Sequence, residues 1–137
     1  MLSNILNQLF KHSNHYFDVR NDPNLKMPGF SFIELDINNR IKPIILINLD
    51  LIPKQQDVLA HVIAHEWGHH VLRHINVPGQ TTPQMPSPEE RQEKEIEADI
   101  YAALFIKEFF YNKKHIESFI LECKFDATNR INILNSV

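Results

Sequence analysis

Apolar side chains recur along much of this chain with the spacing of amphipathic helices. Residues 2 to 12 place apolar side chains at three- and four-residue intervals, which predicts a first helix with one buried face. Similar patterns predict helices over 53–75, 87–111, 113–125 and 127–135. Pro53 suits a first helical position, where its missing N–H is not needed. Ser87-Pro88 followed by Glu90 is typical of a capped helix start.

A different pattern occupies the segment between the first two helices. Phe30 to Ile37 and Ile41 to Asn48 are rich in apolar residues, and Asn38-Asn39-Arg40 between them suits a turn because asparagine tolerates positive φ. The two runs predict an antiparallel β-hairpin. Residues 76 to 87 predict a loop, which is either a mobile flap or a simple connection. The expected fold class is α+β, mostly helical with a small antiparallel sheet.

Length and composition indicate an ordinary globular protein. The 137 residues suit a single domain, spanning 1–137, with one core. A net charge of −3 gives no electrostatic reason to expect a nucleic-acid partner. The chain has no apolar run of membrane-spanning length and no secretory signal pattern, and its single cysteine, Cys123, cannot form an internal disulfide. We therefore expect a cytoplasmic protein with neither a membrane nor a nucleic-acid partner.

The candidate chemistry centres on His65-Glu66-Trp67-Gly68-His69, within the helix expected over 53–75. Two residues four apart project from the same side of a helix, so both imidazoles can bind one divalent metal ion. Glu66 can reach a water molecule on that metal, and each residue type therefore has a chemical reason for its place. A hydrolytic zinc site needs three protein ligands and an open position for water.

A third ligand is available on the helix expected over 87–111. Glu95 and Asp99 are also four apart and face one side of that helix. Glu95 can complete the coordination sphere, while Asp99 can accept the outer ring N–H of a ligand histidine and fix its tautomer. Glu97 lies about 160° around the helix from Glu95, and Glu93 has no Asp four positions further on. The predicted ligands of Zn²⁺ are therefore His65, His69 and Glu95.

His65-Glu66-x-x-His69 followed by Glu95-x-x-x-Asp99 resembles the gluzincin group of zinc metallopeptidases. In that group, two helices supply His, His and Glu. The chain is similar in size and layout to the soluble minigluzincins, and the run from Pro43 into the motif also resembles ImmA/IrrE-type peptidases. Those peptidases usually carry Asn where this chain has Asp99. The resemblance covers residues 30 to 107 approximately and implies a minimal zincin-like domain.

The resemblance implies a soluble zinc metalloendopeptidase that acts on a protein or peptide substrate. A bound Zn²⁺ would lower the pKa of its water to about 7, and Glu66 would act as the general base. The family often uses a second electrophile, and the candidates for this oxyanion stabiliser are Tyr101, Tyr111 and His115. Gluzincins place a peptide-pairing edge strand before the motif helix, where this chain has Ile44 to Asn48.

Other histidines and aromatic residues have simpler explanations. His61 is expected to be packed or solvated, and His70 and His74 are expected to lie at an exposed helix end. Cys123 is expected to be a small buried hydrophobic residue. The aromatic residues expected in the core or, for the first of them, in a cleft wall are Trp67, Tyr101, Phe105, Phe109 and Phe110.

A second hypothesis comes from a different functional class. The chain would then be a zinc-containing protein-interaction module that binds a partner without cutting it. Glu66 favours catalysis, because a structural zinc site has no use for a general base and is normally closed by four ligands. The short stretch of chain after Glu95 leaves little wall for a deep cleft, which favours a restricted substrate or a latent enzyme.

Overall fold

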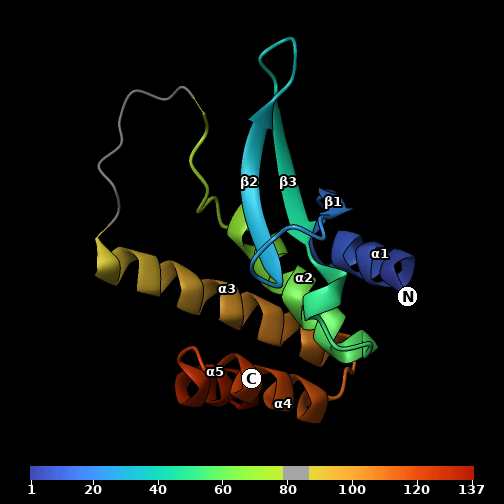
Figure 1. Ribbon diagram of the computed structural model, residues 1–137, viewed down its shortest axis with the longest axis vertical. Coiled ribbons are helices and arrows are strands. Elements are labelled where there is room, and N and C mark those ends of the chain that lie inside the picture. Colours follow the sequence, from blue (N-terminus) through green and yellow to red (C-terminus); the bar gives the residue numbers. More distant parts are fainter. Residues whose placement is uncertain (79–86) are drawn as a thin grey trace.

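The computed structural model describes residues 1–78 and 87–137, and its fold is α+β as predicted (Figure 1). The predicted loop over 76–87, whether flap or connection, falls largely on 79–86, outside the described residues. In the described part of the chain, no helix has both the length and the apolar character needed to cross a bilayer. The elements in chain order are α1 (Leu2–Ser13), β1 (Asp18–Asn21), β2 (Gly29–Leu35), β3 (Ile41–Ile47), the 3-10 turn η1 (Leu49–Leu51), α2 (Gln56–Val71), α3 (Pro88–Glu108), α4 (Lys113–Cys123) and α5 (Ala127–Asn135).

The sheet has three strands in the order β1-β3-β2. β2 and β3 pair antiparallel, with Ser31 opposite Ile45, which confirms the predicted hairpin. β1 is an additional strand that pairs parallel with β3, with Asp18 opposite Ile44, so the sheet is mixed. Its four residues are too few to show a sequence period. Because β1 covers the other side of β3, the expectation that the strand from Ile44 to Asn48 is a free edge is wrong, and β2 is an edge strand.

Helix α2 is shorter at both ends than the apolar pattern predicts. It begins at Gln56, because Pro53 lies in a preceding turn in which its carbonyl accepts a hydrogen bond of 2.7 Å from the N–H of Gln55. It ends at Val71, because Arg73 adopts a left-handed conformation with φ of 58°. The motif lies in the well-formed interior of this helix.

Helix α2 runs through the centre of the molecule, with the sheet on one side and α3 and α4 on the other (Figure 1). Most of its residues are buried. Close packing with α3 depends on small side chains: Ala98, Ala102 and Ala103 are fully buried. A side chain added at Gly68 would approach Tyr101 to 3.0 Å. This packing brings the two motif-bearing helices into contact.

Helix α3 begins as predicted and ends early. Ser87 Oγ accepts a hydrogen bond of 3.2 Å from the N–H of Glu90, and Pro88 is the first helical residue. The helix ends at Glu108, because Phe110 adopts φ of 59°. The predicted start of α4 and both ends of α5 agree with the structure, whereas α4 ends at 123 instead of 125.

The core contains most of the aromatic residues expected there. Trp67 and Phe105 are fully buried, and Tyr101 and Phe109 pack partly buried against the core. Phe110 is 94% exposed, so its expected burial is wrong; it follows the end of α3 and points away from the packed face. Cys123, expected to be buried, is exposed at the end of α4.

Candidate metal centre

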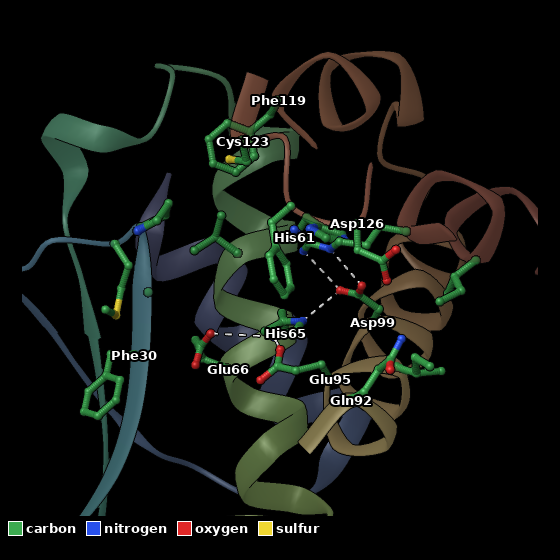
Figure 2. Close-up of a pocket in the computed structure, with 18 of the residues that line it drawn as sticks. Phe30, His61, His65, Glu66, Gln92, Glu95, Asp99, Phe119, Cys123 and Asp126 are labelled. Carbon is green, nitrogen blue, oxygen red and sulfur yellow. Dashed lines mark hydrogen bonds and ion pairs between the residues drawn. The ribbon is translucent and has the colours of Figure 1, made fainter. Parts of the chain in front are cut away.

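Two imidazoles from α2 and one carboxylate from α3 meet at a single point. Nε2 of His65 lies 2.9 Å from Oε2 of Glu95, and Nε2 of His69 lies 3.2 Å from Oε1 of Glu95. The two Nε2 atoms are 3.2 Å apart. Donors bound to tetrahedral zinc at ordinary bond lengths are about 3.3 Å from one another. The three predicted ligands therefore form a group that can hold a metal ion; Figure 2 shows Glu95 reaching from α3 toward His65.

Asp99 holds the outer nitrogen of His65. Its Oδ1 lies 2.8 Å from His65 Nδ1, which matches the role predicted for Asp99. With Nδ1 engaged by this carboxylate, Nε2 is the ring nitrogen that faces Glu95, and a metal would bind there in place of the Nε2 proton. Arg130 of α5 donates to Asp99 from Nε at 2.8 Å and from Nη2 at 3.2 Å. Arg130 is not among the predicted site residues, because it belongs to a separate helix and to no motif.

The charges in this cluster are tightly coupled. Burial by itself lowers the pKa of His65, but hydrogen bonds to Asp99 and Glu95 outweigh burial and raise that pKa to about 10. Burial acts to raise the pKa of Asp99, yet its hydrogen bonds to His65 and Arg130 hold it well below its usual range. The pKa of Glu95 is also lowered, because contacts with two ring nitrogens outweigh its burial. Both carboxylates are therefore ionised at neutral pH, as a metal site requires.

Glu66 lies beside the cluster, where a base for a metal-activated water has to be. Its Oε2 is 3.9 Å from Nε2 of His65, and its side chain is 12% exposed. Ser31 of β2 donates its hydroxyl to Glu66 Oε1 at 2.9 Å. Gly29, on the same strand, leaves room for this arrangement, since a Cβ there would lie 3.0 Å from Glu66 Cγ. Neither strand residue is predicted from the sequence, because no local pattern links β2 to the motif.

The outer nitrogen of His69 also has a partner. Its Nδ1 lies 3.0 Å from Nδ1 of His74, whose Nε2 lies 2.9 Å from Oε2 of Glu97. The expectation that His70 and His74 lie at an exposed helix end is wrong. The His74 side chain is 7% exposed because the turn after α2 folds back over His69, and His70 is buried with Nε2 2.9 Å from a carbonyl of β3. Glu97, the rival of Glu95 as a ligand, contacts His74 instead.

A cavity of about 1040 Å³ opens beside Glu66 and extends toward α4 and α5 (Figure 2). His61 of α2 lines this cavity and is 3% exposed. Burial is the main reason that the pKa of His61 is lowered to about 3; the charge of Asp99 opposes the shift and that of Arg130 supports it. His61 is therefore a packed histidine, one of its two expected states, and it is neutral at ordinary pH.

The three candidate oxyanion stabilisers lie away from the cluster. None of Tyr101, Tyr111 and His115 lines the cavity. The hydroxyl of Tyr111 donates to a glutamine of α1, and His115 Nδ1 lies 2.8 Å from Asp57, about 12 Å along α2 from His65. Tyr101 packs edge-to-face against a histidine ring of α1. The structure does not bring these residues to the candidate metal position, because α1 and the first turn of α2 hold them elsewhere.

Comparison of the chain with models of protein families, with curated proteins and with solved structures finds no match. The chemistry of the site therefore has to be derived from its own residues. Two imidazoles and one carboxylate can bind a divalent cation, and Glu66 lies within reach of a water on that cation. The adjoining cavity can admit a ligand to the cluster.

Proposed function

We propose that the protein is a zinc-dependent peptidase of the gluzincin kind. The observation that carries this proposal is the meeting of His65, His69 and Glu95 with Glu66 beside them. Two imidazoles and one carboxylate are the donor set of catalytic zinc sites that keep a fourth position for water. Within the described residues, the group contains no fourth histidine, cysteine or carboxylate. This composition favours a catalytic centre over a closed structural one.

The roles of the surrounding residues follow from their contacts. When bound, zinc supplies a water of lowered pKa and a Lewis acid for the scissile carbonyl. Glu66 takes the proton of the water and later delivers it to the departing amine. The Ser31 hydroxyl holds Oε1 of Glu66, which leaves Oε2 on the side of His65 Nε2. Asp99 keeps His65 in the tautomer that ligates through Nε2.

The position of β2 supports an extended peptide as the substrate. Gly29 and Phe30 line the cavity, and in the described part of the chain no strand pairs with the outer edge of β2. An extended peptide can add to such an edge through backbone hydrogen bonds, while its side chains enter neighbouring pockets. A peptide bound in this way would pass beside Glu66. The central position of β3 excludes that strand from the same role.

A cleavage assay on the zinc-loaded protein tests the proposal. A mixture of synthetic peptides of random sequence is incubated with the wild-type chain and with Glu66→Gln, and new termini are identified by mass spectrometry. We expect the wild type to cleave and Glu66→Gln to cleave at least about 100-fold more slowly while it retains zinc. Glu93→Gln, on an exposed position of α3, is the matched control and should behave as the wild type.

Two results would contradict the proposal. Cleavage by Glu66→Gln at the wild-type rate would remove Glu66 from the mechanism. A wild-type chain that binds one zinc ion but cuts none of the peptides, under conditions in which the metal site is saturated, would favour the protein-interaction module.

A further inference from the structure

We propose that His74 and Glu97 are positioning residues for the metal ligand His69, and that they tighten metal binding through its outer nitrogen. The inference rests on the metal site of the proposed function but not on peptide cleavage. It is carried by two contacts, His69 Nδ1 to His74 Nδ1 at 3.0 Å and His74 Nε2 to Glu97 Oε2 at 2.9 Å. A metal ion held by His65, His69 and Glu95 would bind the opposite nitrogen of His69, so neither His74 nor Glu97 would be a ligand.

The backbone turn at the end of α2 places His74 against His69. The N–H of His74 bonds to the carbonyl of His69 at 2.9 Å, and the N–H of Arg73 bonds to the carbonyl of His70 at 3.1 Å. Arg73 between them has φ of 58°. This pair of hydrogen bonds around a left-handed residue is the Schellman motif, which ends helices. The residue that follows the left-handed position is thereby returned to the last turn of the helix.

The hydrogen-bonding capacity of each ring sets the direction of the contacts. Ligation through Nε2 of His69 requires the proton of that ring to be on Nδ1, where it needs an acceptor. His74 Nδ1 is that acceptor when the proton of His74 is on Nε2, and the Nε2–H then donates to the Glu97 carboxylate. With this assignment, each N–H in the two contacts faces an acceptor. The assignment leaves the lone pair of His69 Nε2 on the side where the metal-binding atoms of His65 and Glu95 lie.

Residues of α3 therefore act on the Nδ1 atoms of both ligand histidines. Asp99 acts directly on His65, whereas Glu97 acts on His69 through the His74 ring. Glu95, Glu97 and Asp99 follow one another at alternate positions of the same helix. Such partners fix the orientation of a ligand ring and raise its basicity, and their loss typically weakens metal binding about 10- to 100-fold.

A zinc competition titration against a chromophoric chelator tests this inference. We expect His74→Ala to weaken zinc binding about 10- to 100-fold, and His74→Gln to recover part of the loss because its amide oxygen can accept from His69. Glu97→Ala should weaken binding by a smaller factor, while Glu93→Ala, at an exposed position of the same helix, should leave it unchanged. Arg73→Gly, which favours the same left-handed turn, should also keep the wild-type affinity.

A second measurement separates positioning from a general loss of structure. In the zinc-bound, ¹⁵N-labelled wild type, the Nδ1–H of His69 should give a protected, hydrogen-bonded NMR signal that exchanges faster in Glu97→Ala. Glu97 is exposed, so this substitution leaves the core intact.

Three outcomes would overturn the inference. Unchanged zinc affinity in both His74→Ala and Glu97→Ala would show that the contacts contribute nothing. A loss in His74→Ala as deep as that in His69→Ala would make His74 a ligand, and a proton on Nε2 of His69 in the zinc-bound protein would reverse the assigned direction. Failure of peptide cleavage with the expected affinity pattern intact would contradict only the proposed peptidase activity.

Discussion

Ser31 on the edge strand β2 donates its hydroxyl to the carboxylate of Glu66 at 2.9 Å and lies 3.1 Å from the backbone carbonyl of the same residue. The strand therefore does more than cover α2. It holds the candidate general base in one orientation, and the same strand lines the cavity into which that base faces.

Ser31→Ala tests this link between the strand and the base. Loss of a hydrogen bond to a charged group weakens its positioning by roughly 1.5–3 kcal/mol, so we expect peptide cleavage to fall about tenfold or more. Zinc affinity should not change, because Ser31 contacts none of the three ligands. The measurement is kcat with zinc content determined in parallel. Wild-type kcat in Ser31→Ala would show that Glu66 does not depend on the strand.

Gly29→Ala tests the space that the strand leaves for Glu66. The added Cβ would lie 3.0 Å from Glu66 Cγ and 3.2 Å from Val62 Cγ1, so these side chains have to shift by a few tenths of an ångström, and Glu66 is the nearer of the two. We expect a loss of cleavage of about tenfold with zinc retained, since the displaced group is not a ligand. A crystal structure of the variant would show a changed side-chain torsion at Glu66. An unmoved carboxylate would contradict this explanation of the glycine.

The sequence predicts those parts of the site that depend on helical geometry. His65 and His69 on one helix and Glu95 and Asp99 on another face one side because each pair is four residues apart. The helix cap at Ser87 is predicted for the same kind of local reason. Residue spacing and local hydrogen bonding are sufficient to predict these features from the sequence.

The remaining site residues depend on tertiary contacts that no local pattern describes. Ser31 reaches Glu66 only because β2 packs on α2, and Arg130 reaches Asp99 only because α5 packs on α3. His74 is misread as an exposed residue, because its burial depends on a left-handed turn at an arginine, where glycine is the usual residue. β1 is missed because a four-residue strand has too few positions to show a period.

Arg130→Leu tests whether Arg130 stabilises the contact between Asp99 and His65. It removes both donors to Asp99, a buried carboxylate that is then left with His65 as its partner. We expect the free energy of unfolding to fall by about 2–4 kcal/mol and zinc affinity to fall by up to about tenfold. The stability and zinc affinity of Arg130→Lys should lie between those of Arg130→Leu and the wild type. A single ammonium group cannot reproduce the two hydrogen bonds that the guanidinium makes with Asp99. Equal stability of Arg130→Leu and wild type in urea denaturation would contradict the assignment.

His61 gives the protein a specific sensitivity to acid. Its pKa is lowered from 6.5 to about 3 in the folded chain, so below pH 6.5 the unfolded chain binds a proton that the folded chain does not. The stability that a neutral His61 contributes is present above pH 6.5 and is lost progressively as the pH falls toward 3. Between pH 7 and pH 5, the wild type should lose about 2 kcal/mol more than His61→Phe, which has no proton to bind. Urea denaturation with a chelator present measures the difference, and parallel losses in the two proteins would contradict it.

The central claim is that His65, His69 and Glu95 form one metal site, and a zinc titration of the purified chain tests it most directly. Competition with a chromophoric chelator should give one zinc ion per wild-type chain. Glu95→Ala should bind at least about 100-fold more weakly, because loss of a ligand removes more than loss of an outer partner. Glu66→Gln should bind as the wild type does. No zinc bound by the wild type, or equal affinity in Glu95→Ala, would contradict the account.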